Sequence, residues 1–293
     1  MRDSSPKFRA GSPCWRTANA LESIDSMTSH YVVIKSRDNQ TAKSLIALAH
    51  SARERKKTSL TVLDGAHLVE AFLGTTAPLE YLVLAESAIG SRDATKMLGI
   101  AGERKIVCHV LADALIAEAS QLESPASMMA VVRTPSSQPI PVDADAVLVL
   151  DNVQDPGNVG AMLRGAAAFG IAHTLLGVGT AFAWSPKVLR SAQGAHFQLN
   201  IVEGASVASF MQSFRGQTLA LVAAADGAIR LQDHNLRRPT AILVGNEGAG
   251  LAEEIIARAT HRLTIPMPGN MESLNAASSG VIAMYEMCRQ RQR

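Results

Sequence analysis

Cysteine is scarce in this 293-residue sequence, and the three cysteines lie far apart. Cys14, Cys108 and Cys288 have neither the clustering of a disulfide framework nor the spacing of a zinc site. The eight histidines are also scattered, and no pair of them has a third ligand candidate beside it. We therefore expect free thiols, no metal, and a location in the reducing cytoplasm.

Long apolar runs and a strong net charge are missing as well. No run approaches the roughly 18 residues that cross a bilayer, so a membrane-spanning protein is not expected. Residues 1–28 have cations but no apolar signal-peptide core, and we expect a disordered tail there. The net charge of +2 is too small to indicate a nucleic-acid partner, which must instead be sought in local clusters.

The composition and length indicate a globular protein of two domains. Hydrophobic residues make up 47% of the chain, and 293 residues exceed the usual size of one domain. Over 29–133, helical spacing alternates with strand-like runs such as SLTVLDG and KIVCHVL, which predicts a small α/β domain. The stretch 134–145, TPSSQPIPVDAD, is rich in proline, serine and aspartate and predicts a linker.

A basic cluster, ARERKK, is expected at the end of the first helix of the small domain. Cations stabilise the C-terminus of a helix, so a solvated helix end is one interpretation. Closely spaced cations just before a strand are also typical of a corner that contacts phosphates. The second interpretation makes four residues candidates for RNA contact: Arg53, Arg55, Lys56 and Lys57.

The carboxyl-terminal region, 146–293, has a different pattern. Continuous apolar runs of strand length, among them AVLVLDNV, AILVGNEG and HRLTIPM, alternate with helical stretches. Strands that are apolar throughout are buried on both faces, so this pattern predicts a parallel sheet with helices on each side. Such sheets bind ligands at the carboxyl ends of their strands, and a site is expected there.

Two of these strand ends carry polar residues in glycine-rich surroundings. In DNVQDPGNVGAMLRGAAAFG, Asn158 is expected to cap a slim helix in which Arg164 is the one large cation. In AILVGNEGAGL, Glu247 follows Gly245 at the mouth of the sheet. The glycine spacing there is neither that of a P-loop nor that of a Rossmann fingerprint, so a simple tight turn is the alternative.

A third strand end is followed by IPMPGNMESLNAASSGVIAMYE, in which a helix rich in small residues is expected to start at Ser273. Ser273 can be an ordinary N-cap or a functional group. Leu274 can form an apolar wall and Asn275 can face a ligand. A helix with one face of small residues allows another backbone or a ligand to approach closely.

These three segments, in this order and spacing, resemble the three signature motifs of the SpoU/TrmH family of RNA ribose 2′-O-methyltransferases. The resemblance covers about 146 to 290. The amino-terminal segments RDNQTAKSLIALAHSARERKK and TVLDGAHLVEA also resemble the small, ribosomal-protein-like RNA-binding domain that many members carry. The resemblance implies an α/β fold whose carboxyl-terminal chain forms a deep trefoil knot, a rare topology. It also implies S-adenosylmethionine as cofactor and a homodimer formed through the knotted domains.

The resemblance, carried over position by position, implies two sets of site residues. The cofactor would be lined by Gly245, Ile265 and Leu274, with Met267 nearby. In-line transfer to a ribose hydroxyl requires alignment of the reactants and loss of the hydroxyl proton. The polar set that serves this step would be Asn158, Arg164, Glu247, Ser273 and Asn275. A guanidinium is rarely neutral, so positioning of phosphate and ribose is the firmer role for Arg164.

The amino-terminal domain implied by the resemblance favours ribosomal RNA as the substrate. Transfer RNA is the alternative, because such a domain indicates RNA binding and not which RNA is bound. A non-catalytic RNA-binding or ribosome-assembly protein with this fold would be expected to have degenerate motifs, whereas the whole polar set is present. A dinucleotide-dependent oxidoreductase would need a glycine fingerprint after its first strand, and DNVQDPGNVG does not supply one.

Overall fold

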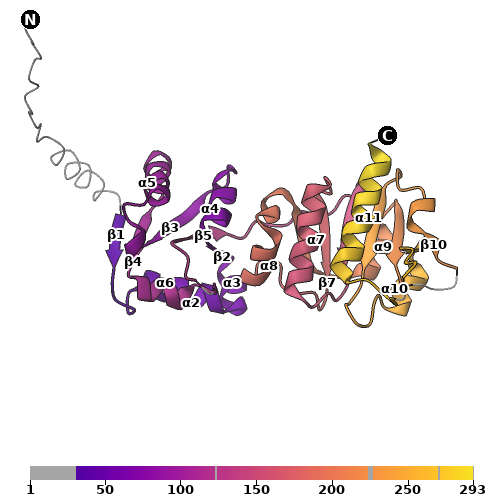
Figure 1. Cartoon of the computed structure of the whole chain (residues 1–293), viewed down its shortest axis with the longest axis horizontal. Coiled ribbons are helices and arrows are strands. Elements are labelled where there is room, and N and C mark those ends of the chain that lie inside the picture. Colours follow the sequence, from indigo (N-terminus) through magenta and orange to yellow (C-terminus); the bar gives the residue numbers. More distant parts are fainter. Residues whose placement is uncertain (1–30, 123, 224–226, 270, 293) are drawn as a thin grey trace, which may run out of the picture.

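A computed structural model describes residues 31–122, 124–223, 227–269 and 271–292, which form two β-sheets flanked by helices (Figure 1). The five-stranded sheet has the order β1-β4-β3-β5-β2, and the seven-stranded sheet has the order β10-β12-β9-β11-β6-β7-β8. The two sheets follow one another along the long axis of the molecule in Figure 1. The tail predicted for residues 1–28, with Cys14, lies outside the described residues.

The five-stranded sheet is mixed. β1, β4 and β3 run parallel, whereas β5 pairs antiparallel with β3 and β2. Helices α4 and α5 pack on one face, and α2 and α6 pack on the other. The strands and helices of this part are β1 (Tyr31–Ile34), α2 (Gln40–His50), α3 (Ala52–Thr58), β2 (Leu60–Asp64), α4 (Ala66–Leu73), β3 (Leu79–Ala85), η2 (Glu86–Ala88), α5 (Arg92–Arg104), β4 (Cys108–Leu111), α6 (Asp113–Ala119) and β5 (Met128–Arg133).

The seven-stranded sheet is parallel in every described pairing. None of the helices in the described residues has the length and apolar character needed to cross a membrane. The elements of this part are β6 (Ala146–Leu150), α7 (Pro156–Ala168), β7 (His173–Gly177), α8 (Pro186–Ala192), η3 (Ala195–Gln198), β8 (Asn200–Ala205), α9 (Val207–Ser213), β9 (Gln217–Leu221), β10 (Ile229–Arg230), η4 (Leu231–Asp233), β11 (Thr240–Val244), α10 (Glu253–Arg258), β12 (His261–Thr264) and α11 (Ala276–Arg291).

Strand β6 explains why its sequence is apolar throughout. Leu148 and Leu150 join the core beneath α7, α8 and α11, whereas Val147 and Val149 join a second core beneath α9 and α10. Successive side chains of a strand point to opposite faces, so a strand between two helix layers buries all of them. The predicted α/β fold with helices on both faces of a parallel sheet is therefore confirmed.

Glycines allow the three helices on one face to approach closely. A Cβ atom added to Gly160 of α7 would lie 2.3 Å from the Ser191 Cβ of α8. A Cβ on Gly165 would lie 2.8 Å from the Met284 Cε of α11. Both distances are shorter than van der Waals contact, so the slim faces predicted from the sequence serve helix packing between α8, α7 and α11.

The two sheets are joined by packing between their flanking helices. Phe72 of α4 meets Phe197 of η3 edge to face, with 5.1 Å between ring centroids. Gly194 has φ of +86°, and a Cβ there would lie 2.8 Å from the Ala71 Cβ. Residues 134–145, predicted as a linker, contain no helix or strand. The domain limits predicted as 29–133 and 146–293 stay predictions.

Three helix boundaries differ from those predicted. The basic cluster is not the end of the first helix, because Ser51 is extended and caps a separate helix, α3. Helix α7 is capped by Asp155, whose Oδ1 accepts the Asn158 N–H at 2.8 Å, and not by Asn158. Helix α11 begins at Ala276 with Asn275 as its N-cap, and not at Ser273. The corrections for α7 and α11 each exchange one capping residue for another of similar capping preference.

Candidate active site

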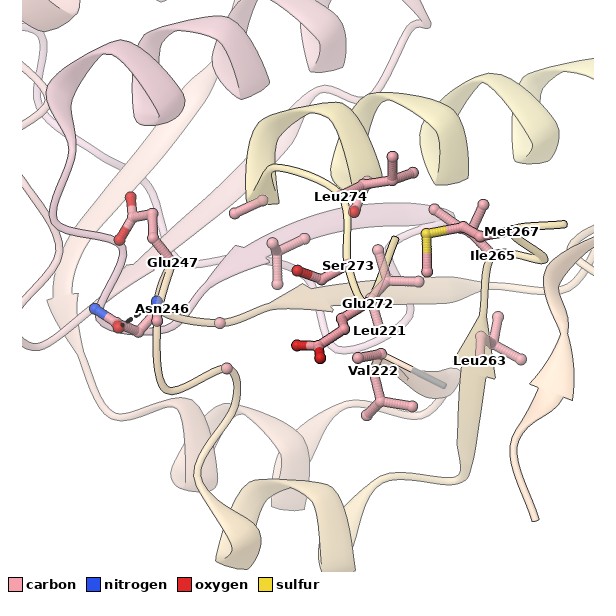
Figure 2. A pocket seen from close by; sticks show the side chains of 17 residues that line it. Leu221, Val222, Asn246, Glu247, Leu263, Ile265, Met267, Glu272, Ser273 and Leu274 are labelled. Atoms are coloured by element: carbon pink, nitrogen blue, oxygen red, sulfur yellow. Dashed lines mark hydrogen bonds between the residues drawn. The ribbon is translucent and has the colours of Figure 1, made fainter. Parts of the chain in front are cut away.

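A cavity of about 310 Å³ opens at the carboxyl ends of β9, β11 and β12 (Figure 2). The edge is the one expected, since parallel strands present their carboxyl ends together. The wall is contributed by the strand ends and by the segment that leads into α11. The lining consists of Leu221, Val222, Ala223, Val244, Gly245, Asn246, Glu247, Gly248, Gly250, Leu263, Ile265, Met267, Glu272, Ser273, Leu274, Ala276 and Ser279.

The cavity is apolar at one end and polar at the other. In Figure 2, Ile265, Met267 and Leu263 lie at one end, and Asn246 and Glu247 lie at the other. For the described residues 267–269 and 271–274, the backbone hydrogen bonds formed outside helices and strands involve none of their N–H or C=O groups. A mostly apolar pocket requires a few polar contacts, and these backbone groups can supply them.

Gly245 is needed where β11 leaves the sheet. A Cβ at this buried position would lie 2.2 Å from the Gly250 carbonyl carbon and 2.2 Å from the Leu251 nitrogen. The loop closes on itself because Asn246 and Gly250 exchange two backbone hydrogen bonds, of 3.0 and 2.9 Å. Any side chain at position 245 would therefore displace this loop from the cavity wall.

Three polar side chains form a hydrogen-bonded chain beside the cavity. Asn275 Nδ2 donates to Asn158 Oδ1 at 2.9 Å. Asn158 Nδ2 then donates to Glu247 Oε1 at 3.0 Å. The three side chains come from three segments of the chain, and Asn158 is separated from Glu247 by 89 positions and from Asn275 by 117. We call Glu247, Asn158 and Asn275 the relay.

The relay is held at both ends by the backbone. The Glu247 carboxylate accepts the backbone N–H of Gln154 at 3.1 Å and of Asp155 at 3.0 Å. At the other end, Asn275 Oδ1 accepts the N–H groups of Ala277 and Ser278 while it caps α11. The amide orientation of both asparagines follows from these donors and acceptors.

The charge state of Glu247 follows from the same contacts. Burial alone raises the pKa of this carboxyl, but the hydrogen bonds from Asn158, Asp155 and Gln154 outweigh burial and lower the pKa below its ordinary value. Glu247 is therefore an anion at neutral pH. A carboxylate that already accepts several hydrogen bonds and has a lowered pKa is a poor proton acceptor, and the contacts of Glu247 hold Asn158 and the β6–α7 loop.

The residues predicted for the cofactor do lie together. Gly245, Ile265, Met267 and Leu274 all line the cavity, and so do Glu247 and Ser273 from the predicted polar set. Asn158 and Asn275 reach this wall through the relay. The sequence analysis missed the wall formed by Leu221, Val222 and Ala223 at the end of β9, and it missed Asn246 and Glu272. The end of the apolar run LALVAAAD was the available signal for the β9 wall.

Arg164 stands apart from these residues. It is exposed on α7 and does not line the cavity. Six positions separate it from Asn158, which on an α-helix is about 9 Å along the axis and about 240° around it. Asn158 and Arg164 therefore leave the helix in different directions, and the hydrogen bonds that form the relay do not include Arg164.

The predicted RNA-contacting residues also divide. Arg53 and Lys57 are exposed on α3. Arg55 is 5% exposed, and its Nη1 donates to the Leu48 and Ala49 carbonyls at 2.6 and 3.1 Å. Its guanidinium thus binds the carboxyl end of α2, and the prediction of RNA contact is wrong for this residue. The Lys56 Nζ lies 4.9 Å from the ring centroid of Phe182.

A metal site is not evident in the described part of the chain, where no three His, Cys, Asp or Glu side chains cluster suitably. The two described cysteines, Cys108 and Cys288, are free. Burial raises the pKa of the Cys108 thiol to about 12, so it is an unreactive core residue.

The chain is similar to known RNA methyltransferases. The SpoU rRNA Methylase family model matches residues 145–285. The chain is 33% identical to the 23S rRNA (guanosine(2553)-2′-O)-methyltransferase RlmP of Bacillus subtilis, over 87% of this chain and 98% of that protein. It is 35% identical to the 23S rRNA (uridine(2479)-2′-O)-methyltransferase of Streptomyces viridochromogenes, over 61% of this chain and 66% of that protein.

Solved structures agree with this relationship. A crystal structure of an RNA 2′-O ribose methyltransferase matches with a TM-score of 0.74 and 28% identity, over 89% of this chain and 100% of the other. The SpoU methyltransferase AviRb of Streptomyces viridochromogenes, in complex with the cofactor AdoMet, matches with a TM-score of 0.74 and 27% identity, over 87% of this chain and 98% of the other. The chain belongs to the SpoU rRNA methylase family.

Proposed function

We propose that this protein is an S-adenosylmethionine-dependent methyltransferase that modifies ribose 2′-hydroxyl groups of ribosomal RNA. The relay is the observation that carries the proposal, because it connects all three signature segments at one cavity. The relatives add the substrate class, since RlmP and the Streptomyces enzyme are named as 23S rRNA 2′-O-methyltransferases. The AdoMet complex of AviRb adds the cofactor.

The cavity suits this cofactor. Its volume of about 310 Å³ lies at the lower end of the range of small-molecule sites, roughly 300–1,000 Å³. Its apolar end, with Ile265, Met267 and Leu274, can enclose an adenine ring, and the backbone groups after Met267 can bind its polar edge. When bound, S-adenosylmethionine supplies an electrophilic methyl group.

The residues of the relay position the reacting groups. Asn275 and Asn158 each have their amide orientation set by fixed partners. Their remaining hydrogen-bond donors and acceptors therefore face a defined direction. Glu247 keeps the β6–α7 loop and the β11–α10 loop together through three hydrogen bonds. Ser273 lies on the cavity wall between them and is assigned to the loop that holds the ribose. Alignment of this kind can supply several kcal/mol of a transfer barrier.

Arg164 is assigned to phosphate and ribose positioning. The fork of donors on its guanidinium matches a phosphate. Because Arg164 points away from the relay of its own chain, we propose that it serves the cavity of a second copy in a homodimer. The exposed Ile282 and Tyr285 on α11 support such a dimer face, since they leave apolar surface uncovered.

The predicted trefoil knot belongs to the same proposal. After β12 the chain passes the closed loop between Asn246 and Gly250 and returns to pack as α11 against α7 and β11. This path supports a threaded carboxyl terminus. Location in the cytoplasm, where rRNA is assembled and where free thiols persist, is proposed with it.

The test is transfer of labelled methyl groups to rRNA and to tRNA, both isolated from cells that lack this protein. We expect label in rRNA, recovered after alkaline hydrolysis as a resistant dinucleotide because a 2′-O-methyl group blocks cleavage. Label in tRNA alone would support the transfer RNA alternative. Cofactor binding without label in either pool would support a non-catalytic RNA-binding protein.

A further inference from the structure

Several hydrogen bonds hold the loop between β7 and α8. The Ala183 N–H donates to Glu203 Oε1 at 2.7 Å, and the Ala183 carbonyl is 2.8 Å from His196 Nε2. Burial lowers the pKa of His196 to about 4, so the ring is neutral at pH 7. Among the described residues His196 Nδ1 has no partner, which assigns the single ring proton to Nε2 and makes it the donor. Both polar backbone groups of Ala183 are thus bound by side chains, one from the half-buried Glu203 and one from the buried His196.

Neighbouring contacts extend the same anchor. The Ala181 N–H donates to the Val153 carbonyl at 2.8 Å, and Thr180 Oγ1 donates to the Leu150 carbonyl at 3.1 Å. The Trp184 ring packs on His196 with 4.9 Å between centroids. The loop is therefore tied to β6 on one side and to β8 and η3 on the other.

Phe182, in the middle of this loop, contacts the small amino-terminal part. Its ring centroid lies 4.9 Å from Lys56 Nζ and 5.8 Å from Arg55 Cζ. Arg55 is itself bound to the end of α2, so the ring meets a fixed partner. Glu203 adds a favourable charge interaction with Lys56. Such cation–π contacts hold a cationic helix against an aromatic ring.

The position of this contact links it to the reaction. β7 is parallel to β6 and β11, so the loop after β7 lies on the same edge of the sheet as the cavity. The exposed cations Arg53 and Lys57 are on the helix that Phe182 holds. Phe182 and its anchor therefore contribute, together with the Phe72–Phe197 contact, to the distance along this edge from α3 to the cavity.

We propose that Phe182 is a positioning residue that fixes α3 relative to the cavity and thereby selects which ribose of a bound RNA is methylated. The inference rests on the proposed function, since it needs an RNA that contacts α3 and the cavity at once. RNA phosphates bound by Arg53 and Lys57 place a nucleotide at a set distance along the strand. Movement of α3 by one nucleotide spacing would present the neighbouring ribose.

The two parts stay joined when this contact is lost. Phe72 and Phe197 form a separate contact between α4 and η3, and Gly194 packs against Ala71. Removal of the Phe182 ring is thus expected to loosen α3 without separating the sheets. The loss expected is about 2- to 5-fold in the docking equilibrium for each cation–π contact.

The experiment uses the full chain with Phe182→Leu, and with Phe182→Tyr as the variant that keeps the aromatic face. Each is incubated with rRNA from cells lacking the protein, and the methylated riboses are mapped as alkali-resistant dinucleotides. We expect Phe182→Leu to methylate neighbouring riboses, with a primary-to-secondary ratio lowered at least 2-fold. Phe182→Tyr should restore the single position, and binding of S-adenosylmethionine should be the same in both variants.

Lys56→Met and Lys57→Met form a matched pair, because each removes one cation from α3 but only Lys56 contacts the ring. Both should weaken RNA binding, and only Lys56→Met should spread the methylated positions. This pair also tests the proposal if Phe182→Leu fails to fold. One unchanged methylated ribose in both Phe182→Leu and Lys56→Met would overturn the proposal.

A second measurement separates this inference from the proposed function. If the wild-type protein labels no RNA, the proposed function fails, whereas amide hydrogen exchange in α3 still reports the docking. We expect faster exchange of α3 amides in Phe182→Leu than in Phe182→Tyr, with the exchange of α11 unchanged. Equal exchange of α3 in the two variants would refute the anchor itself.

Discussion

Replacement of Glu247 by alanine perturbs the relay at its charged end. The substitution removes the acceptor of three hydrogen bonds, from Gln154 N–H, Asp155 N–H and Asn158 Nδ2, of 3.1, 3.0 and 3.0 Å. Hydrogen bonds to a charged group are worth about 1.5–3 kcal/mol when buried. Glu247 is exposed to solvent, which replaces part of this, so we expect about 0.5–1 kcal/mol for each bond. The loss of unfolding free energy is then about 1.5–3 kcal/mol.

The same substitution should affect transfer more than cofactor binding. Without Glu247, the Asn158 amide is free to turn, and Asn275 loses its partner in the relay. A misplacement of about 1 Å costs roughly 10²-fold in rate. We therefore expect kcat for methyl transfer to fall about 100-fold, with the Kd for S-adenosylmethionine changed only a few-fold because the apolar end of the cavity is intact.

The assay is urea denaturation followed by circular dichroism, together with single-turnover transfer to rRNA. Glu272→Gln is the control for stability, since it removes a carboxylate charge from the same cavity and Glu272 does not share the hydrogen bonds that Glu247 accepts from Gln154, Asp155 and Asn158. Its unfolding midpoint should equal that of the wild type. A Glu247→Ala protein with the wild-type midpoint and the wild-type kcat would refute the assigned role of the relay.

Three further predictions concern packing, charge and acid stability. Gly160→Ala should destabilise the protein by about 1–3 kcal/mol in thermal unfolding, because the new Cβ would lie 2.8 Å from the Val188 carbonyl oxygen. Gly280→Ala is the control and should destabilise the protein less, because its Cβ would contact chiefly the flexible Met162 side chain. Lys57→Ala should lower the dependence of RNA affinity on log salt by about one unit in a binding titration, and an Arg55→Ala protein with that effect and no loss of stability would contradict the burial of Arg55. Burial lowers the pKa of His196 from 6.5 to about 4, so the stability it contributes is complete above pH 6.5 and about 3 kcal/mol is lost as pH falls to 4. In His196→Gln the slope of unfolding free energy against pH in this interval should be shallower than in the wild type.

The central strands were predictable because burial on both faces requires an apolar composition along the whole strand. β6 and β11 lie between two helix layers, and each is buried along its whole length and appears within a continuous apolar run. β8 was not predicted, because it is an edge strand in which only Ile201 is fully buried. β10 has two residues, which is too short for any period to be visible.

The members of the site were predictable, but their contacts were not. Gly245 and Ile265 directly follow β11 and β12, so their location at the strand ends follows from the chain order. The bonds between Glu247, Asn158 and Asn275 join distant segments, and no local pattern encodes them. Local patterns also did not predict which of two nearby residues of similar chemistry makes a given contact.

The capping choices illustrate that failure. Ser273 and Asn275 are both good N-caps, and only the folded loop decides that Asn275 caps α11. Arg55 and Lys57 are likewise both cations on α3, and only their direction relative to α2 separates a buried anchor from an exposed residue. The position of a residue within a short helix therefore does not predict which partner its side chain binds.

We propose that methyl transfer to ribose in rRNA takes place at the cavity beside the relay. The most direct measurement is mass spectrometry of 2′-O-methylnucleosides from the rRNA of cells that lack the gene, complemented with either the wild-type protein or Asn275→Ala. We predict that one 2′-O-methylnucleoside is depleted in the deletion strain, returns with the wild-type protein and stays depleted with Asn275→Ala. An rRNA methylation pattern that is identical in the deletion and wild-type strains would contradict the account.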